Sequence, residues 1–141
     1  MIGETLQRTT LKQLGKGDFV NIERAARFGD EIGGHLLSGH IMGTAHIESI
    51  ERTAHNCVMW LRCSLEWGKY LFSKGYIALN GASLTLVDVE KATGLFSVHL
   101  IPETLRQTTL GAKKAGDLVN IEIDAQTQAI VETIEGLYAK S

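Results

Sequence analysis

The stretch ETLRQTTLGAKKAGDLVNIE, Glu103–Glu122, is a near copy of ETLQRTTLKQLGKGDFVNIE, Glu4–Glu23. The two segments align without a gap at an offset of 99 positions and are identical at twelve of twenty positions. Shared amphipathic patterning would not reproduce Thr-Thr-Leu and Gly-Asp-x-Val-Asn-Ile-Glu in register, so we interpret the segments as the same part of a duplicated unit. Such a long period indicates a whole small domain and not a solenoid repeat.

The chain is too short to hold two complete copies of this unit, because it has 141 residues. We expect most of the first copy to be absent, either because the sequence is truncated or because the chain restarts at Met1. The predicted organisation is a remnant of the first unit with its linker over residues 1–35, a second unit over 36–126 and a C-terminal helix over 127–141. Residues 1–33 should not close into a domain; they should pack on the second unit or another chain, or be poorly ordered.

Composition and charge are typical of a soluble globular protein, with 44% apolar and 21% charged residues. A net charge of −2 gives no electrostatic reason to expect nucleic acid or an anionic membrane as partner. The sequence also lacks a visible signal peptide and any apolar run long enough to span a membrane. We therefore expect a cytoplasmic protein. Cys57 and Cys63 lie in one expected strand, too far apart to form a disulfide with each other.

Most of the chain has the alternating pattern of short strands. The expected strands are Phe19–Glu23, His40–Ile50, Val58–Leu61, Tyr76–Leu79, Ser83–Val89, Leu95–Ile101 and Leu118–Ile123. Asn80-Gly81 is a strong hairpin signal between two of them. Because about six of these strands fall in the second unit, they predict a small antiparallel barrel, whose closure removes the sheet edges.

The remaining segments are expected to be a connection and a helix. Arg24–Ser38 is predicted to be a connection in which Asp30 caps a short helical turn. From Asp124, the expected N-cap of the last helix, the apolar residues Ile130, Ile134 and Leu137 follow a helical period. This apolar stripe would pack either on the chain's own barrel or on a partner chain.

Three side chains in the second unit are candidates for chemistry. Ser83 and Thr85 are two apart on a strand, so their hydroxyls share one face beside apolar residues, which suits an uncharged heterocycle with carbonyls and ring nitrogens. The alternative is that they simply face solvent on a half-exposed strand. His40 follows Ser38-Gly39, where the backbone can approach a ligand, although a lone histidine is more often structural. No metal-binding spacing and no phosphate-binding glycine motif is present.

Several motifs together resemble one known family. They are Gly39-His40-Ile41 after GGHLLSG, Lys74-Gly75, Asn80-Gly81-Ala82-Ser83-Leu84-Thr85 and the run HLIPETL from His99. In this order and spacing they are similar to the riboflavin synthase family over essentially all of the chain. The repeat would correspond to that family's two tandem lumazine-binding barrels. The resemblance implies an all-β, six-stranded antiparallel Greek-key barrel with a C-terminal helix, preceded by the truncated end of a second such barrel.

The resemblance also implies an activity and partners. The reaction is the dismutation of two 6,7-dimethyl-8-ribityllumazine molecules to riboflavin and 5-amino-6-ribitylaminouracil, a transferase reaction that needs no cofactor. The implied partners are this lumazine and riboflavin, other copies of the chain in a trimer joined by the C-terminal helix, and lumazine synthase as a further candidate.

Site residues carried over from the family fall into two groups. The catalytic group is His40 as a proton shuttle, Ser83 and Thr85 as hydroxyls near ring carbonyls, and Asp124 as an acid that orients a nucleophile or the ribityl chain. In the binding group, the Val98–Thr104 backbone reads the pyrimidine ring, Gly3–Thr5 is the matching edge of the first copy, and Lys74 reaches in from a neighbouring chain. The full binding set is Gly3, Glu4, Thr5, Gly39, His40, Ile41, Lys74, Ala82, Ser83, Leu84, Val98, His99, Leu100, Ile101, Pro102, Glu103 and Thr104.

The sequence departs from the family at its first barrel. The opening Met-Phe-Thr-Gly-Ile-Val and the segment Asn-Gly-Cys-Cys-Leu-Thr are absent. In the family the productive site lies between the first barrel of one chain and the second barrel of the next, so we expect impaired activity. The alternative function is a non-catalytic lumazine- or flavin-binding module similar to the lumazine proteins. Retention of His40, Ser83 and Thr85 favours the enzyme.

Overall fold

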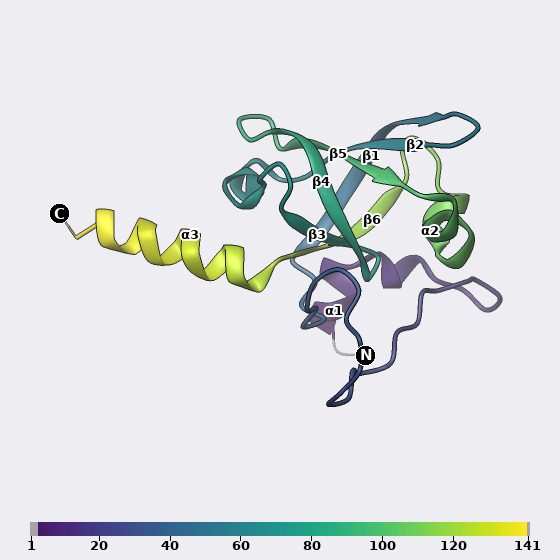
Figure 1. The fold of residues 1–141 in the computed structure, drawn as a ribbon, viewed down its shortest axis with the longest axis horizontal. Helices are drawn as coiled ribbons and strands as arrows, with labels where there is room; N and C mark the ends of the chain where they lie inside the picture. Colours follow the sequence, from purple (N-terminus) through teal and green to yellow (C-terminus); the bar gives the residue numbers. More distant parts are fainter. Residues whose placement is uncertain (1–2, 141) are drawn as a thin grey trace.

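The chain forms one closed antiparallel barrel followed by a projecting helix in a computed structural model that describes residues 3–140 (Figure 1). The six strands are β1 (Gly43–Arg52), β2 (Cys57–Arg62), β3 (Tyr76–Leu79), β4 (Ala82–Glu90), β5 (Leu95–Leu100) and β6 (Leu118–Ile123). Their order around the barrel is β1-β2-β5-β4-β3-β6. Strands β3, β4 and β5 follow one another, and β6 returns beside β3, which is a Greek key. The predicted barrel and C-terminal helix are confirmed.

The barrel core follows from the alternation of the strand sequences. Along β2, every second side chain is buried, namely Cys57, Met59 and Leu61, while the residues between them are partly exposed. Opposite β2 stand Phe96 and Val98 of β5, which are fully buried. Cys57 and Cys63 are free thiols, and burial raises the pKa of Cys63 to about 11. Both cysteines are therefore core residues.

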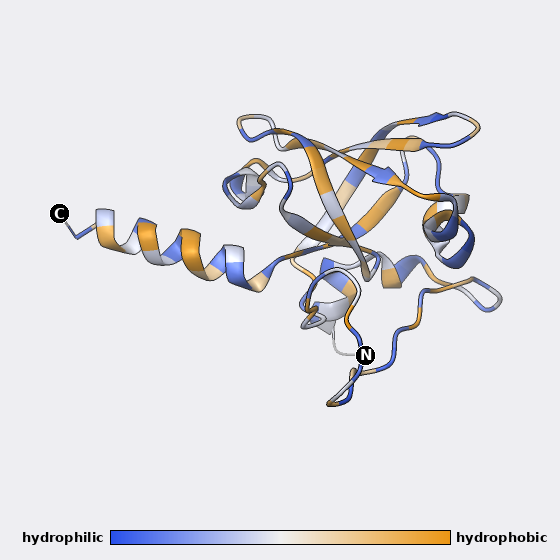
Figure 2. Cartoon of the chain, viewed as in Figure 1, coloured by the Kyte–Doolittle hydropathy of each residue, from blue (hydrophilic) through white to orange (hydrophobic). Residues whose placement is uncertain are grey.

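Helix α3 (Ala125–Tyr138) leaves the barrel and extends into solvent, with its apolar residues visible along its length (Figures 1 and 2). Asp124 caps it, since its Oδ2 accepts a hydrogen bond from the Thr127 backbone N–H at 3.0 Å. The stripe residues Ile130, Ile134 and Leu137 stay exposed, at 60%, 48% and 67%. The first predicted alternative, in which this stripe packs on the chain's own barrel, is therefore wrong. No helix in the described part of the chain is long and apolar enough to cross a membrane.

The N-terminal segment repeats the local structure of its later copy. Helix α1 (Gly3–Arg8) and the 3-10 helix η1 (Thr10–Gln13) correspond to α2 (Pro102–Gln107) and η3 (Thr109–Ala112) at the same offset of 99. The caps match as well: the Thr9 hydroxyl donates to the Thr5 carbonyl at 2.7 Å, and the Thr108 hydroxyl donates to the Thr104 carbonyl at 2.7 Å. The two copies of the repeat therefore have the same local backbone structure as far as the turn before residue 19.

Beyond that turn the two copies diverge, and one prediction is wrong. Residues 19–23 do not form a strand, although the equivalent residues of β6 do. Strand β6 pairs with β1 and β3, whereas no described strand pairs with residues 19–23. Ile22 is accordingly 86% exposed, while its counterpart Ile121 is 0% exposed. A strand needs its ladder partners, and sequence alone does not supply them.

The structure also tests the predictions for the connection Arg24–Ser38, the start of the first barrel strand and the N-terminal segment. Arg24–Ser38 contains no helix; Asp30 instead accepts a hydrogen bond from the Arg27 backbone N–H at 2.7 Å in a simple turn. Strand β1 begins at Gly43, so His40 precedes it. Within the described residues 3–33, no separate domain closes, as predicted; the segment is hydrogen-bonded to the barrel through Thr10 and Asn21, but Phe19 and Ile22 stay exposed and are not covered by the barrel. A further 3-10 helix, η2 (Leu65–Tyr70), contacts the C-terminal half of α3 through a 2.7 Å ion pair between Lys69 and Glu135.

Candidate functional site

Strands β4 and β5 separate at one end and leave an open edge. They pair from the hairpin at Glu90 and Leu95 as far as Leu86 and Val98, and the pairing stops there. Residues 82–85 pair only with β3, and residues 99–100 pair only with β2. Figure 1 shows the two strands diverging from their hairpin toward α2. The backbone groups along the two facing edges are thus available to a planar ligand with its own donors and acceptors.

Ser83 and Thr85 lie on the outer face of β4 at this open edge. Leu84 and Leu86 are buried in the core, so the two hydroxyls point outward, as the strand period predicted. Thr85 stands directly opposite Tyr76 of β3. The outward face therefore joins two hydroxyls and one aromatic ring.

His35 completes this cluster from the linker before the barrel. Its backbone N–H donates to Ser83 Oγ at 3.2 Å, and its Nδ1 lies 2.6 Å from the same oxygen. The imidazole stacks on the Tyr76 ring with centroids 4.9 Å apart and planes 17° from parallel. Gly34 allows this approach, because it has a φ of +85° and a Cβ there would clash with Ser83. The linker is thus tied to the outer face of β4.

The protonation of His35 follows from these contacts. Burial lowers the pKa of His35, and the carboxylates of Asp124 and Glu122 oppose that effect. The imidazole is therefore neutral near pH 7. Nδ1 and the Ser83 hydroxyl share one hydrogen bond: when the hydroxyl donates, the ring proton sits on Nε2, and when Nδ1 donates, Nε2 is an acceptor. Nε2 is buried and has no hydrogen-bond partner in the described part of the chain. Such an orphaned polar atom is costly unless a ligand supplies a hydrogen-bond partner.

Glu122 holds the next turn of the linker. Its side chain is only 4% exposed, and its Oε1 accepts three hydrogen bonds, from Ser38 N at 2.9 Å, Ser38 Oγ at 3.0 Å and Gly39 N at 3.0 Å. Gly39 has a φ of +78°, which favours glycine. This carboxylate fixes the linker between His35 and His40.

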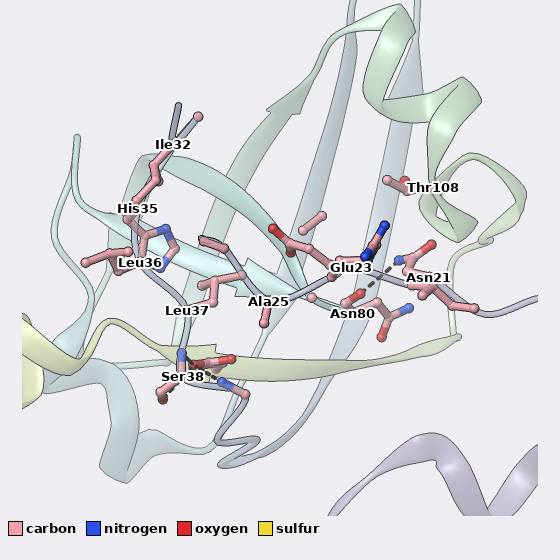
Figure 3. A pocket seen from close by; sticks show the side chains of 18 of the residues that line it. Asn21, Glu23, Ala25, Ile32, His35, Leu36, Leu37, Ser38, Asn80 and Thr108 are labelled. Atoms are coloured by element: carbon pink, nitrogen blue, oxygen red, sulfur yellow. Dashed lines mark hydrogen bonds between the residues drawn. The ribbon is translucent and has the colours of Figure 1, made fainter. Parts of the chain in front are cut away.

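A cavity of about 730 Å³ lies between the linker and the barrel (Figure 3). It is lined by linker residues, by the Asn80–Ala82 turn and by Glu122. His35 lines it too, whereas Ser83 and Thr85 do not. The cavity and the open edge of β4 are therefore neighbouring spaces that meet at His35. We assign the chemistry to the open edge, since the hydroxyls and the unpaired backbone groups lie there.

The structure brings some of the predicted site residues together and leaves others apart. Ser83, Thr85 and Ala82 lie along one side of the open edge, with His99, Ile101 and the start of α2 along the other. The side chains of Leu84, Val98 and Leu100 are buried in the core, so only their backbones can contact a ligand.

Other predicted residues lie farther from this edge. His40 is exposed and its Nδ1 contacts Ser38 Oγ at 3.1 Å. Asp124 caps α3 and acts on His35 electrostatically. Lys74 is exposed with a φ of 67°, and Gly3–Thr5 lie in or at α1.

Sequence reasoning missed three residues of this site, namely His35, Tyr76 and Glu122. The signal for His35 was present in the Gly33-Gly34-His35 run, because paired glycines mark a place where backbone approaches another group closely. Nothing in the sequence pointed to Glu122, since its three donors are 83 and 84 residues away along the chain. Only the barrel brings them together.

Comparison with known proteins identifies what this geometry is similar to. The family model for the lumazine binding domain matches residues 38–124. The riboflavin synthase of Escherichia coli K12 is 51% identical over 140 residues, which cover 99% of this chain and 65% of that protein. The riboflavin synthase of Chlamydia pneumoniae is 51% identical over 141 residues, which cover 100% of this chain and 68% of that protein. The chain thus spans about two thirds of the length of these curated relatives.

Solved structures share the fold. A crystal structure of LumP complexed with riboflavin superimposes with a TM-score of 0.78 and 24% identity, covering 87% of this chain and 66% of that one. A crystal structure of LumP complexed with 6,7-dimethyl-8-(1'-D-ribityl) lumazine gives a TM-score of 0.75 and 22% identity, covering 87% and 64%. At these identities the likeness describes the barrel and its helix, not the chemistry of the site.

Proposed function

The chain belongs to the lumazine-binding domain family, and we propose that it is the second-barrel part of a riboflavin synthase. Its relatives at 51% identity carry that name. The proposed reaction converts two molecules of 6,7-dimethyl-8-ribityllumazine to riboflavin and 5-amino-6-ribitylaminouracil. One lumazine gives up a four-carbon unit and the other accepts it, so the activity is that of a transferase. In this proposal residues 36–126 bind one lumazine.

The observation that carries this proposal is the open edge between β4 and β5, closed on its outer side by His35. A pyrimidinedione ring has carbonyl acceptors and an N–H donor along one edge. The unpaired backbone groups of residues 82–85 and 99–100 are complementary to such an edge. The orphaned Nε2 of His35 supplies a further hydrogen-bonding atom for a ribityl hydroxyl or the ring edge. Ser83 and Thr85 would contact the ring on its other side.

The roles of these residues follow from the chemistry of the reaction. One lumazine must lose a proton from its 7-methyl group, and the resulting carbanion is delocalised into the ring carbonyls. Hydrogen-bond donors at those carbonyls stabilise the developing charge. Thr85 is one donor proposed here, and the second is the Ser83 hydroxyl when His35 Nδ1–H donates to Ser83, or His35 Nε2–H when the Ser83 hydroxyl donates to Nδ1. His40 is the proposed proton shuttle, because it lies on the exposed end of the linker and imidazole is the side chain that most often transfers protons in catalysis.

The assembly is also part of the proposal. We infer a homotrimer formed through α3, because its apolar residues Ile130, Ile134 and Leu137 are exposed. In such an assembly the substrate site of one copy faces another chain, which would place Lys74 and Asp124 at that site. Lumazine synthase remains a proposed partner, and the cytoplasm a proposed location, because the substrate and product are small metabolites of a cofactor pathway.

Ligand binding tests the proposal directly. Purified chain should bind riboflavin and 6,7-dimethyl-8-ribityllumazine in a fluorescence titration. Ser83→Ala and Thr85→Ala should each weaken binding about two- to twelve-fold, because a neutral hydrogen bond contributes about 0.5–1.5 kcal/mol. Ser64→Ala is the matched control, since Ser64 is exposed at the start of η2, near the β4–β5 hairpin at the far end of the barrel. A folded protein that binds neither compound at millimolar concentration would contradict the proposal.

A second candidate is a non-catalytic lumazine- or flavin-binding module. The solved structures of LumP with riboflavin and with the lumazine favour it only at the level of fold. Turnover separates the two functions. An enzyme should produce riboflavin from the lumazine and lose that activity in His40→Ala, whereas a binding module should hold the lumazine unchanged and bind it equally well after His40→Ala.

A further inference from the structure

The Ser38 hydroxyl lies between a buried carboxylate and an exposed imidazole. Glu122 of β6 is only 4% exposed, and its Oε1 accepts the Ser38 hydroxyl at 3.0 Å. The same oxygen accepts the backbone N–H groups of Ser38 and Gly39 at 2.9 and 3.0 Å. Figure 3 shows Ser38 at this turn, with hydrogen bonds drawn as dashed lines. On its other side, the Ser38 hydroxyl oxygen lies 3.1 Å from His40 Nδ1. The three side chains therefore form one chain of hydrogen bonds.

The single proton of the Ser38 hydroxyl can serve only one of its two neighbours. If the hydroxyl donated to His40, its oxygen would present only lone pairs to Glu122 Oε1 at 3.0 Å, and the two electron-rich oxygens would repel each other. If the hydroxyl donates to Glu122, it makes a charge-assisted hydrogen bond, which is stronger than a neutral one. The hydroxyl therefore donates to Glu122 and is left as an acceptor for His40.

This direction of the hydrogen bonds selects one tautomer of His40. Because the Ser38 oxygen is an acceptor, Nδ1 must carry the ring proton, and in the neutral ring the free lone pair is then on Nε2. Neutral histidine in water favours the other form, with the proton on Nε2, so the turn stabilises the tautomer that is less populated in water. His40 is exposed, so a ligand can reach its ring.

We propose that Glu122 and Ser38 are positioning residues that hold His40 in its Nδ1–H tautomer and make Nε2 its proton acceptor. Their role rests on the proposed function, in which His40 removes a proton from the 7-methyl group of the lumazine. In that step the methyl C–H bond breaks, its electron pair delocalises into the ring carbonyls, and the proton forms the Nε2–H bond. His40 becomes an imidazolium whose Nδ1–H still donates to Ser38, and the Glu122 carboxylate stabilises that charge through the hydroxyl.

The backbone of the turn does not need the Ser38 hydroxyl. The backbone N–H groups of Ser38 and Gly39 reach Glu122 by themselves, and Ser38→Ala keeps both of these bonds. Ser38→Ala therefore separates the tautomer of His40 from the shape of the turn. Ser38→Thr is the matched control, since it retains a hydroxyl. Glu122→Gln keeps an acceptor oxygen without the charge, which makes donation from the hydroxyl to His40 less costly.

Nitrogen-15 NMR of the full chain measures the tautomer without any ligand, because ring nitrogens with and without a proton have well-separated shifts. Spectra at about pH 8.5 suit the measurement, since histidine is mostly neutral there. His40→Gln identifies the His40 signals among those of the five histidines. In the wild type, Nδ1 should be the protonated nitrogen. Loss of one neutral hydrogen bond in Ser38→Ala should shift the tautomer ratio about two- to twelve-fold toward Nε2–H. Ser38→Thr should keep the wild-type ratio, and Glu122→Gln should give an intermediate one.

Exchange of the lumazine 7-methyl protons in heavy water measures proton removal from a single ring. The rate above that of a chain-free sample should fall in proportion to the fraction of the Nδ1–H form, because only that form can accept a proton at Nε2. The proposal is overturned if wild-type His40 carries its proton on Nε2, if Ser38→Ala or Glu122→Gln leaves the ratio unchanged, or if exchange does not follow the tautomer. A folded wild type that binds no lumazine would instead contradict the proposed function, and the NMR ratio would still decide the tautomer.

Discussion

Thr109 donates its backbone N–H to Asn21 Oδ1 at 2.7 Å, across 88 residues of sequence. With the reciprocal bond from Thr10 to Asn120, it fixes the remnant of one repeat against the other as two halves of a symmetric pair. The two copies of the repeat therefore contact each other through equivalent residues, and the contribution of each residue can be tested by substitution.

The bond between Thr10 and Asn120 should be measurable as a coupling energy. Asn120→Ala should lower the free energy of unfolding by about 0.5–1.5 kcal/mol, the usual contribution of a neutral hydrogen bond. In a Thr10→Pro background the same change should cost close to nothing, because the donor is already absent. Urea denaturation of the four proteins at low concentration completes the double-mutant cycle. Equal losses in both backgrounds would mean that the two residues are not coupled.

Gly34→Ala should detach the linker from Ser83. Gly34 has a φ of +85°, and an added Cβ would clash with Ser83 Oγ and lie 2.7 Å from Ser83 Cβ. We expect flavin binding to change by at least about five-fold, corresponding to ~1 kcal/mol of left-handed strain for a residue with a Cβ. Gly33→Ala is the matched control, since nothing lies within 4 Å of a Cβ there. Similar titration curves for the two variants would show that the close approach of Gly34 to Ser83 does not affect ligand binding.

Glu122→Ala should destabilise the turn that carries His40. Three donors of Ser38 and Gly39 would lose their shared acceptor in a buried place, at a cost of about 1–3 kcal/mol. Glu122→Gln should cost less, because its amide oxygen can still accept. Thermal unfolding gives the ranking, and ligand titration shows whether the turn matters for binding. A glutamine variant as unstable as the alanine variant would point to the charge instead of the hydrogen bonds.

Protonation of His35 should weaken the fold in mild acid. Burial lowers the pKa of His35 below the ordinary histidine value of about 6.5, so the unfolded chain binds more protons than the folded one between the two pKa values. Stability is thus full above about pH 6.5 and declines as the pH falls through the folded pKa. Thermal midpoints from pH 7.5 to 5 should drop more for the wild type than for His35→Gln. Parallel profiles would show that His35 titrates alike in both states.

Turnover by this chain should be slow even if it binds the lumazine well. The reaction needs two rings held against each other, and correct positioning of two reactants contributes about 7–11 kcal/mol to catalysis. Loss of even part of that positioning should lower the rate by at least about 10³-fold relative to a riboflavin synthase with both barrels. Riboflavin formation is followed by absorbance, with the Escherichia coli enzyme as reference. Fast turnover that depends on His40 would show that a homo-oligomer of this chain rebuilds the second wall.

The sequence alone predicted the barrel and the placement of two hydroxyls of the candidate site on one face of β4. Strand period and turn chemistry are local properties, so Tyr76–Leu79 and Leu118–Ile123 were predicted with the bounds that the structure has. That Ser83 and Thr85 share one face of β4 followed from the same period, whereas the structure shows that this face is the outer one, because Leu84 and Leu86 are buried. The repeat also predicted that residues 1–33 would not close into a domain, and left open whether they would pack on the barrel, pack on another chain or be poorly ordered. Each of these inferences used neighbours in sequence or an identity between two segments.

Tertiary structure decided what depends on contacts across the chain. Residues 19–23 have the sequence of a strand and remain irregular, because a strand is stabilised by ladder partners that lie far away in sequence. Sequence drew attention to His40, while the fold placed His35 on Ser83 and gave Glu122 its three donors. Hydrogen bonds between residues 48 or 84 positions apart leave no periodic trace in a sequence. They exist only once the barrel has closed and fixed the distance between its two ends.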